Sequence, residues 1–466
     1  MRWPVCGRAR WSRNGNGGDE RVDLINQALS FSGLVHTVVA FVVALSIIVF
    51  VHEFGHYIVG RWSGIHAEVF SLGFGPVLLA RTDRHGTRWQ ISALPFGGYV
   101  RFLGDSDAAS GRDDTALATL SQDEMRHTMH GAPLWARAAT VLAGPAFNLI
   151  FSILLLMVLN LVTGVPTDPP TIGSLKTMPG STAALQPGDR ILAVNGTPTP
   201  DAKAFGTVTT ALKTTGPVQY SIERGGQKLT VDGPNPMPAR ADAVAPDSAA
   251  YAAGIVPGDV VTAVDGKPID AFEQLRQAVA DSGGAPLKLT LWRKGQISQV
   301  TLSPRRSDLP TTGGAFETRW LIGISGGLFF DPKTRTPGPL EALTGAVDQT
   351  RYIVLTSLSG LYHMLTGAIS SCNLHGPIGI ADASGVAASQ GAMSFFSFIA
   401  MLSTAVGLLN LFPVPVLDGG HLVFHAWEAL TGRPPSERAL KLLMGGGLFL
   451  ILSLMAFALS NDVFCP

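Results

Sequence analysis

VVAFVVALSIIVFVHEFGHYIVGRW, residues 38–62, is an apolar stretch that is long enough to cross a membrane as one helix. A spanning helix needs about 20 apolar residues, because the hydrocarbon core of a bilayer is about 30 Å thick. Three ionisable side chains, His52, Glu53 and His56, interrupt this run near its end. Such a group at membrane depth costs at least about 2.5 kcal/mol, so it usually faces a protein interior and serves a function. The stretch therefore predicts a membrane protein with chemistry at membrane depth.

The composition of the whole chain agrees with this interpretation. Of the 466 residues, 46% are hydrophobic and only 15% are charged, which is unusual for a soluble enzyme. Lys and Arg together number 34, as do Asp and Glu, so no net charge favours nucleic acid as a partner. The three cysteines, Cys6, Cys372 and Cys465, are far apart and lack C-x-x-C spacing. They indicate neither a disulfide framework nor a thiolate metal site.

Outward from the first span, the hydropathy pattern predicts a polytopic α-helical membrane protein. We expect four spans, at residues 36–62, 139–163, 391–430 and 441–460. Residues 1–35 are predicted to form a polar, disordered leader, and residues 63–138 a cytoplasmic, membrane-associated β-hairpin followed by a loop. Residues 335–390 are predicted to form a linker with an amphipathic helix.

A segment between the second and third spans repeats itself. The stretch LQPGDRILAVNG at residues 185–196 recurs as IVPGDVVTAVDG at residues 255–266, an offset of 70 residues. In each copy Pro-Gly-Asp indicates a turn, the apolar run a short strand, and Asn-Gly or Asp-Gly a hairpin. The pattern resembles PDZ domains, which predicts two inserted PDZ-like α+β domains at residues 170–235 and 238–304. Another small β-rich repeat is the alternative.

The most specific motif is His52-Glu53-Phe54-Gly55-His56. Residues four apart share one face of a helix, so both imidazoles can reach the same zinc ion while Glu53 lies beside it as a general base. The motif therefore predicts a Zn²⁺ site with His52 and His56 as ligands and Glu53 as the catalytic residue. A structural polar network, or an ion site without hydrolysis, is the alternative in a buried helix.

A catalytic zinc ion usually takes a third protein ligand. Asp418 is the best candidate, because Pro413 and Pro415 just before it break the third span at membrane depth. Irregular backbone is tolerated there only within protein or around a cavity. A helix cap or turn residue before Gly419 is the alternative for this aspartate. His421 and His425 are predicted to lie behind the ligands or at an interface.

Four features in order resemble the site-2 protease family of intramembrane zinc metalloproteases, and within it the bacterial regulators of sigma-E. They are H-E-F-G-H in the first span, Gly144-Pro145-Ala146-Phe147-Asn148 in the second, the tandem repeats, and N-x-x-P-x-P-x-x-D-G-G-H at residues 410–421. The resemblance covers residues 38–460. The arginine-rich leader and a shortened first repeat depart from the family pattern.

The resemblance implies regulated intramembrane proteolysis in a bacterial inner membrane. The expected substrate is a single-pass membrane protein, such as an anti-sigma factor, that another protease has already trimmed and that is cut within or near its span. Peptide C-termini at the PDZ-like domains and the lipid bilayer are the other expected partners. Asn410 and Pro413 are predicted to contact the substrate, although a helix-packing hydrogen bond would explain Asn410 equally. A metal transporter and a non-catalytic PDZ scaffold are the rival functions.

Basic residues in two connecting loops set the expected orientation. The loop after the first span is rich in arginine, and the loop after the third contains Arg433, Arg438 and Lys441. The positive-inside tendency places both loops in the cytoplasm, so the PDZ-like insert and both termini should lie outside. Arginines in the leader oppose this placement for the N-terminus.

Overall fold

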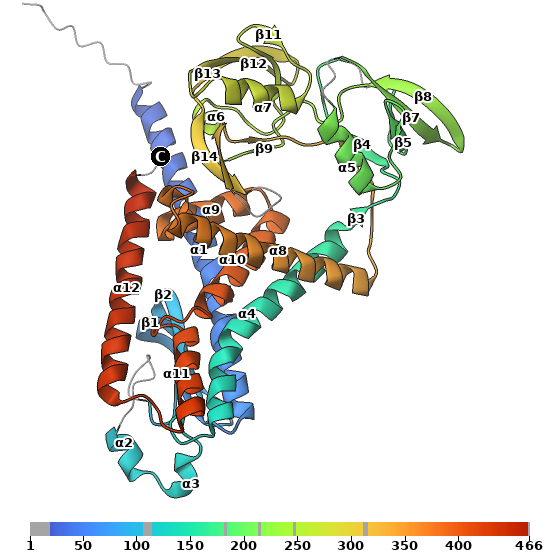
Figure 1. Ribbon diagram of the computed structural model, residues 1–466. Helices are drawn as coiled ribbons and strands as arrows, with labels where there is room; N and C mark the ends of the chain where they lie inside the picture. The colour runs from blue at the N-terminus through green and yellow to red at the C-terminus, as the bar shows by residue number, and fades with distance from the viewer. Residues whose placement is uncertain are drawn as a thin grey trace, which may run out of the picture.

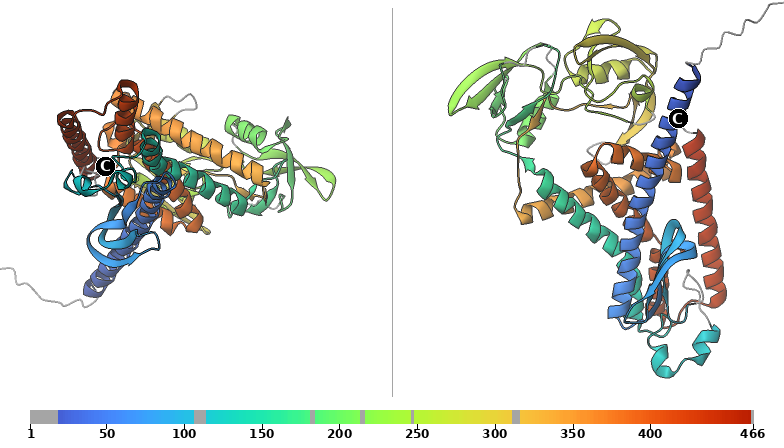
Figure 2. Two further views of the ribbon diagram at one scale, coloured as in Figure 1. Left: turned by 90° about the horizontal axis from the view of Figure 1, so that it is seen from below. Right: turned by 180° about the vertical axis from the view of Figure 1, so that it is seen from behind.

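A computed structural model describes residues 19–105, 114–180, 184–212, 216–245, 248–310 and 316–464. Helices form an elongated bundle, and two small strand-rich units lie side by side at one end of it (Figures 1 and 2). The first and last described residues lie toward that same end (Figure 1). The strand-rich part is thus an insert that projects from one end of the helical bundle.

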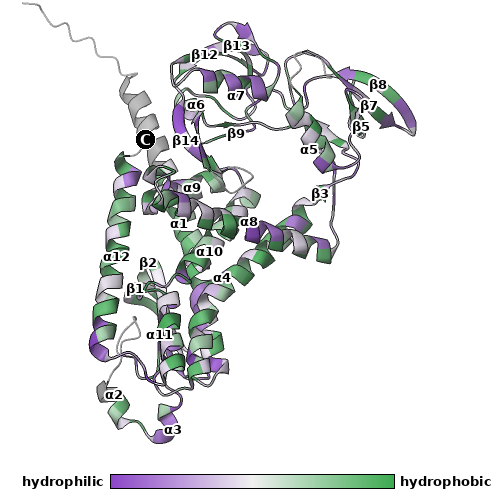
Figure 3. Cartoon of the chain, viewed as in Figure 1, coloured by the Kyte–Doolittle hydropathy of each residue, from purple (hydrophilic) through white to green (hydrophobic). Residues whose placement is uncertain are grey.

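Four helices in the described residues are long and apolar enough to cross a membrane. They are α1 (Asp19–Trp62), α4 (Leu134–Thr163), α10 (Ala392–Asn410) and α12 (Glu437–Phe464). Hydrophobic residues dominate α4, α10 and α12 along their length (Figure 3). The number of spans agrees with the prediction from the sequence.

Two boundaries differ from the prediction. Residues 19–35, expected within a disordered leader, belong to α1, whereas residues 1–18 lie outside the described residues. This extension contains no proline, so no residue in it interrupts the helix. The predicted third span divides into α10 and a separate helix, α11 (Asp418–Thr431), because the proline-containing turn between them cannot continue a helix.

The chain after α1 forms a two-stranded β unit that is more folded than a simple hairpin. Strand β1 (Ala67–Thr82) pairs with β2 (Arg88–Phe102), but Phe70 pairs with both Val100 and Trp89. Each long strand is therefore bent into two segments, and residues 69–72 lie between the two segments of β2. Two short helices, α2 (Asp114–Thr119) and α3 (Gln122–Met125), lead from this unit to α4.

Each copy of the repeat forms a four-stranded antiparallel sheet with one main helix. Its Asn-Gly or Asp-Gly turn is tight, since Asn195 and Asp265 adopt φ values of 47° and 49°. The first sheet has the order β6-β5-β7-β8 and the second β11-β10-β12-β13. The bounds are β5 (Arg190–Val194), β6 (Thr197–Pro198), α5 (Ala202–Ala211), β7 (Val218–Arg224) and β8 (Gln227–Gly233), then β10 (Val260–Val264), β11 (Lys267–Pro268), α7 (Phe272–Asp281), β12 (Leu287–Arg293) and β13 (Gln296–Leu302).

Each of the two copies also contains an ion pair between an arginine and a buried aspartate. Arg224 Nη2 lies 2.7 Å from Asp189 Oδ2, and Arg293 Nε lies 2.6 Å from Asp259 Oδ1. In both copies the aspartate of Pro-Gly-Asp is buried and accepts a further hydrogen bond from a backbone N–H three residues earlier. The same polar arrangement at equivalent positions supports an internal duplication.

The chain returns from the second copy to complete the first. Phe329 and Phe330 are fully buried in the first copy's core, where they pack with residues such as Ile191 and Tyr220. Three pairs of short strands make this return: β16 (Ile324–Ser325) with β9 (Ala243–Val244), β17 (Phe330–Pro332) with β4 (Ile172–Leu175), and β18 (Thr334–Arg335) with β3 (Val165–Pro166). The second copy's part of the chain also contains α6 (Ala249–Ala252) and the hairpin of β14 (Arg305–Pro310) and β15 (Phe316–Leu321). The insert therefore enters and leaves the bundle at one place.

Two helices connect the insert to α10. In α8 (Pro339–Leu365), Ala342 and Ala346 are buried, whereas Leu340, Leu355 and Tyr362 are exposed. Its apolar character on both sides agrees with a helix that packs on the bundle and meets lipid on its outer face. The second helix is α9 (Pro377–Ser389), which packs against α1.

Candidate metal centre

His52 and His56 lie one turn apart on α1 and point their Nε2 atoms at the same place. The two Nε2 atoms are 3.2 Å apart. The opposite nitrogen of His56, Nδ1, lies 2.8 Å from the backbone oxygen of Thr140 on α4. Because a carbonyl can only accept, Nδ1 of His56 carries the proton and leaves Nε2 free to bind a metal.

Asp418 completes the group from a different part of the chain. Its Oδ2 atom lies 3.1 Å from His52 Nε2 and 3.5 Å from His56 Nε2. Asp418 is the first residue of α11, directly after the turn that contains Pro413. A Cβ atom on the next residue, Gly419, would come within 2.3 Å of the backbone oxygens of Leu411 and Phe412. Glycine there lets α11 start close against the end of α10, which brings the carboxylate to the histidines.

Three observations test whether these residues fit a metal ion. The ligand atoms of His52, His56 and Asp418 all lie within 4.8 Å of one another. Among the described residues, Asp418 Oδ2 is buried without a hydrogen-bond partner and has only the two imidazoles at ion-pair distance. A Cβ atom at Gly144 of α4 would lie 2.3 Å from His56 Nε2, so glycine keeps the space beside the ligand atoms open. The donor set and the space both fit a zinc ion.

Glu53 lies beside this group and is held by the β unit. The backbone N–H of Val100 donates to its carboxylate, and the side chains of the two histidines and Asp418 are its neighbours. Gly98 lies so close that a Cβ atom there would come within 3.1 Å of Glu53 Cγ. Strand β2 therefore holds the Glu53 carboxylate next to the predicted ligands. The carboxylate is not itself one of them.

The remaining predicted site residues lie near the group but do not join it. Asn410 ends α10, and its Nδ2 atom donates to the backbone oxygen of Val406, 3.1 Å away. Pro413 lies in the turn before Asp418, and His421 and His425 follow on α11, where His421 packs edge-on against Phe424. The amide of Asn410 is thus used within its own helix in this structure.

Three further residues, Thr140, Val100 and Asn148, contact the predicted ligands and Glu53. They are not among the predicted site residues. Thr140 and Val100 act through backbone atoms, so their side chains give no signal. Asn148 is different, because its amide lies 3.3 Å from His52 Nδ1 and it stands out as a polar residue in an apolar span.

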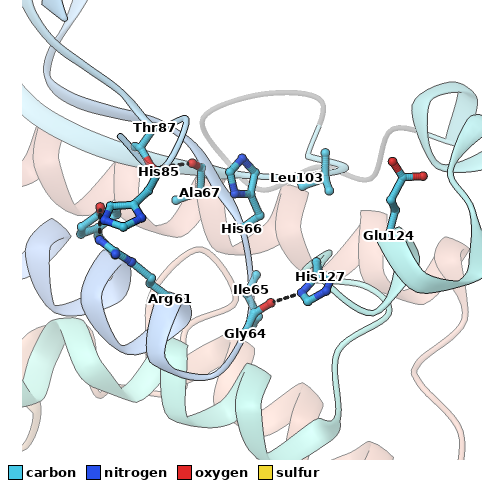
Figure 4. Close-up of a pocket in the computed structure, with 11 residues that line it drawn as sticks. Arg61, Gly64, Ile65, His66, Ala67, His85, Thr87, Leu103, Glu124 and His127 are labelled. Carbon is cyan, nitrogen blue, oxygen red and sulfur yellow. Dashed lines mark hydrogen bonds between the residues drawn. The ribbon is translucent and has the colours of Figure 1, made fainter. Parts of the chain in front are cut away.

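A cavity of about 380 Å³ lies at the C-terminal end of α1, between this helix, the β unit and α3 (Figure 4). Arg61, His66, His85, His127 and Glu124 line it. None of the predicted ligands borders it, so it is separate from the metal-ligand group.

The sequence of the chain matches that of known proteases over nearly its whole length. The profile of peptidase family M50 matches residues 40–454. The chain belongs to this family. A protein of Rhizobium meliloti named as a zinc metalloprotease is 37% identical over 440 residues, which cover 94% of this chain and 98% of the relative. The regulator of sigma-E protease RseP of Salmonella typhimurium is 34% identical over 456 residues, with 91% and 97% covered.

Membership of family M50 confirms several predictions. The protein is a metallopeptidase, its cofactor is zinc, and it resembles the site-2 proteases, as the sequence motifs indicated. A relative of Agrobacterium fabrum, also named as a zinc metalloprotease, is 34% identical and covers 94% of this chain. The four apolar helices agree with a membrane metalloprotease.

Proposed function

We propose that this protein is an intramembrane protease that cleaves single-pass membrane proteins within or near their spanning helix. One observation supports this most strongly: the ligand atoms of His52 and His56, on a helix long enough to cross a membrane, converge with that of Asp418 at the start of α11. Because RseP is named as a regulator of sigma-E protease, an anti-sigma factor is the expected kind of substrate. A bacterial inner membrane is the expected location.

The proposed roles follow from the chemistry of each residue. His52, His56 and Asp418 would hold zinc, which when bound would supply a Lewis acid that polarises a carbonyl and acidifies water. Glu53 takes a proton from the attacking water and gives it to the leaving amine. Strand β2 keeps the Glu53 carboxylate in place through the Val100 N–H. Asn410 and Pro413 stay proposed substrate contacts, and rotation would free the Asn410 amide from Val406.

Removal of zinc from the purified protein tests the proposal. We expect a chelator to abolish cleavage of a model membrane substrate in detergent or liposomes. Without zinc, the scissile carbonyl is not polarised and the attacking water is not acidified. Dilution into zinc should restore cleavage, whereas magnesium should not, because imidazole ligands favour zinc. Zinc content and cleavage are measured on the same samples. Full activity in protein shown to be free of metal would contradict the proposal.

The two ends of the bundle differ in a way that supports an orientation. Cys372 is disulfide-bonded, although the cysteine spacing does not indicate a disulfide framework. It lies beside the C-terminal end of α12, at the end of the bundle where the insert lies, because Asn461 donates to the backbone oxygen of Ser371. Disulfides persist in oxidising compartments outside the cytoplasm. The end of α1, with Arg61, and the start of α4, with Arg137, lie at the opposite end of the bundle, as does the connection from α11 to α12, with Arg433 and Arg438 (Figure 1). Both features support an orientation in which the insert lies outside the cytoplasm and the end of the bundle nearest the zinc motif faces the cytoplasm.

We further propose that the two copies of the repeat are PDZ-like domains that control admission of substrate. They project from the bundle at the end away from the zinc motif (Figure 1), so they cannot take part in bond breaking. A bulky outer domain on a substrate would collide with them, whereas a trimmed stump would pass. The new C-terminal carboxylate of such a stump is a ligand that PDZ-like folds recognise. The alternative role is stability of the fold alone.

Deletion of the insert should remove this selection. Val165 pairs with Arg335 and Pro166 with Thr334, so the ends of the cut are already neighbours and a short glycine–serine linker can replace residues 167–333. We expect the shortened protein to keep its zinc and to cleave trimmed and untrimmed substrates at similar rates. The full protein should prefer the trimmed one. A shortened, zinc-loaded protein that still discriminated as well as the full chain would refute the admission role.

A further inference from the structure

We propose that Asn148 positions His52 for metal binding, because its side-chain oxygen accepts a hydrogen bond from the Nδ1–H of His52. This inference rests on the zinc site proposed above. Asn148 lies on α4, is fully buried, and places its amide 3.3 Å from His52 Nδ1. It touches neither Asp418 nor Glu53 by any hydrogen bond within the described residues, so its role is to position a ligand.

The need for an acceptor follows from the geometry of the two rings. His52 points its Nε2 atom at His56 Nε2 and Asp418 Oδ2, so a metal there would bind Nε2. A neutral imidazole that ligates through Nε2 carries its proton on Nδ1. In His56 the Nδ1–H donates a hydrogen bond to the backbone oxygen of Thr140, 2.8 Å away. His52 needs an equivalent acceptor, and the amide of Asn148 occupies that place.

The amide of Asn148 offers either an acceptor or a donor to the ring. Its nitrogen faces His52 Nδ1, whereas its oxygen is buried and has no hydrogen-bond partner. With the nitrogen facing the ring, the proton of His52 belongs on Nε2 and points at Asp418, 3.1 Å away. Rotation of the amide by half a turn exchanges its oxygen and nitrogen with little change of shape. The oxygen then accepts from Nδ1, which is the arrangement that metal binding through Nε2 requires.

The surroundings of Asn148 restrict it to this role. Its backbone oxygen accepts from the hydroxyls of Ser152, at 2.9 Å, and Ser403 of α10, at 3.0 Å. Gly407 of α10 packs so closely that a Cβ atom there would lie 3.2 Å from Asn148 Cβ. The backbone and Cβ are therefore fixed between α1 and α10, and rotation of the terminal amide is the motion left to the side chain.

Three variants of the full-length protein test the inference through zinc retention. Asn148→Leu keeps the size of the side chain but removes the acceptor, so the chelator concentration that strips half of the zinc should fall about 10- to 100-fold. Asn148→Asp keeps an acceptor oxygen in place and should retain zinc at least as well as the wild type. Asn160→Leu makes the same change further along α4, where the amide donates to Ala342. This control should retain zinc like the wild type.

Each result separates this inference from the proposed function. Wild-type protein that binds no zinc would refute the zinc site itself. A wild type that binds zinc, with Asn148→Leu binding it equally tightly, would overturn only the role of Asn148. Equal loss in Asn148→Leu and Asn148→Asp would also overturn it, because a purely structural asparagine is not rescued by an acceptor. If Asn148→Leu does not fold, Asn148→Ala replaces it in the same comparison.

Discussion

Glu53→Gln is expected to purify with the zinc content of the wild-type protein and to cleave a model membrane substrate about 10²- to 10⁴-fold more slowly. Glutamine has nearly the same shape and can keep the contact with β2, but it cannot take a proton from water. The zinc ligands that we propose, His52, His56 and Asp418, are untouched by the change. Activity and metal binding should therefore separate in this variant.

The comparison requires metal content and cleavage rate on the same preparations. Glu68→Gln is the matched control, because it makes the same change on β1, where Glu68 pairs with Arg101 at 3.1 Å. It should leave both zinc and cleavage unchanged. Loss of zinc from Glu53→Gln would show that Glu53 is itself a ligand. Undiminished cleavage would show that Glu53 is not the general base.

The predictable parts of this protein have signals that are local in the sequence. The zinc-motif helix follows from an apolar run with two histidines four residues apart, and the end of α10 follows from Pro413 and Pro415. The duplication is visible because residues 185–196 and 255–266 have the same order of turn and strand residues. In each case the residues that specify the structure are neighbours along the chain.

The remaining features depend on contacts between distant segments. Phe329 and Phe330 belong to the core of the first copy, although they follow the second copy in the sequence. No periodic pattern in residues 326–333 indicates which sheet they join. The bent pairing of β1 and β2 depends on register shifts along both strands, which the sequence of either strand does not specify. Alternation along one strand fixes which side chains share a face, but not which strand pairs with it.

The metal-ligand group shows the same division. Their spacing alone predicts His52, Glu53 and His56 as site residues, and the broken helix before it predicts Asp418. Their supporting groups are not predicted, because the Thr140 oxygen and the Val100 N–H are backbone atoms brought to the histidines and the glutamate by packing. Sequence patterns report side chains, whereas part of this site is made by the approach of one backbone to another.

The role of Asp418 gives the second large effect that we expect. Asp418→Ala should purify without zinc and without measurable cleavage, because two histidines on one helix turn are fewer ligands than a catalytic zinc site usually has. The rest of α11 should stay in place, since Arg137 of α4 donates to the carboxylate of Glu428 from Nη1 and Nη2, at 3.0 and 2.7 Å. The variant therefore tests a ligand without removing the contact that anchors its helix.

Zinc per chain and melting temperature are the measurements that decide the Asp418→Ala result. Asp462→Ala is the control, since it also removes a carboxylate from a helix; Asp462 accepts backbone hydrogen bonds from Gly376 and Ile378 near the C-terminus. It should keep zinc, so that loss in Asp418→Ala reflects the metal site and not the loss of a carboxylate in general. One zinc ion per chain in folded Asp418→Ala would exclude this residue as a ligand. The aspartate would then be only the first residue of α11, the alternative that its place before Gly419 also allows.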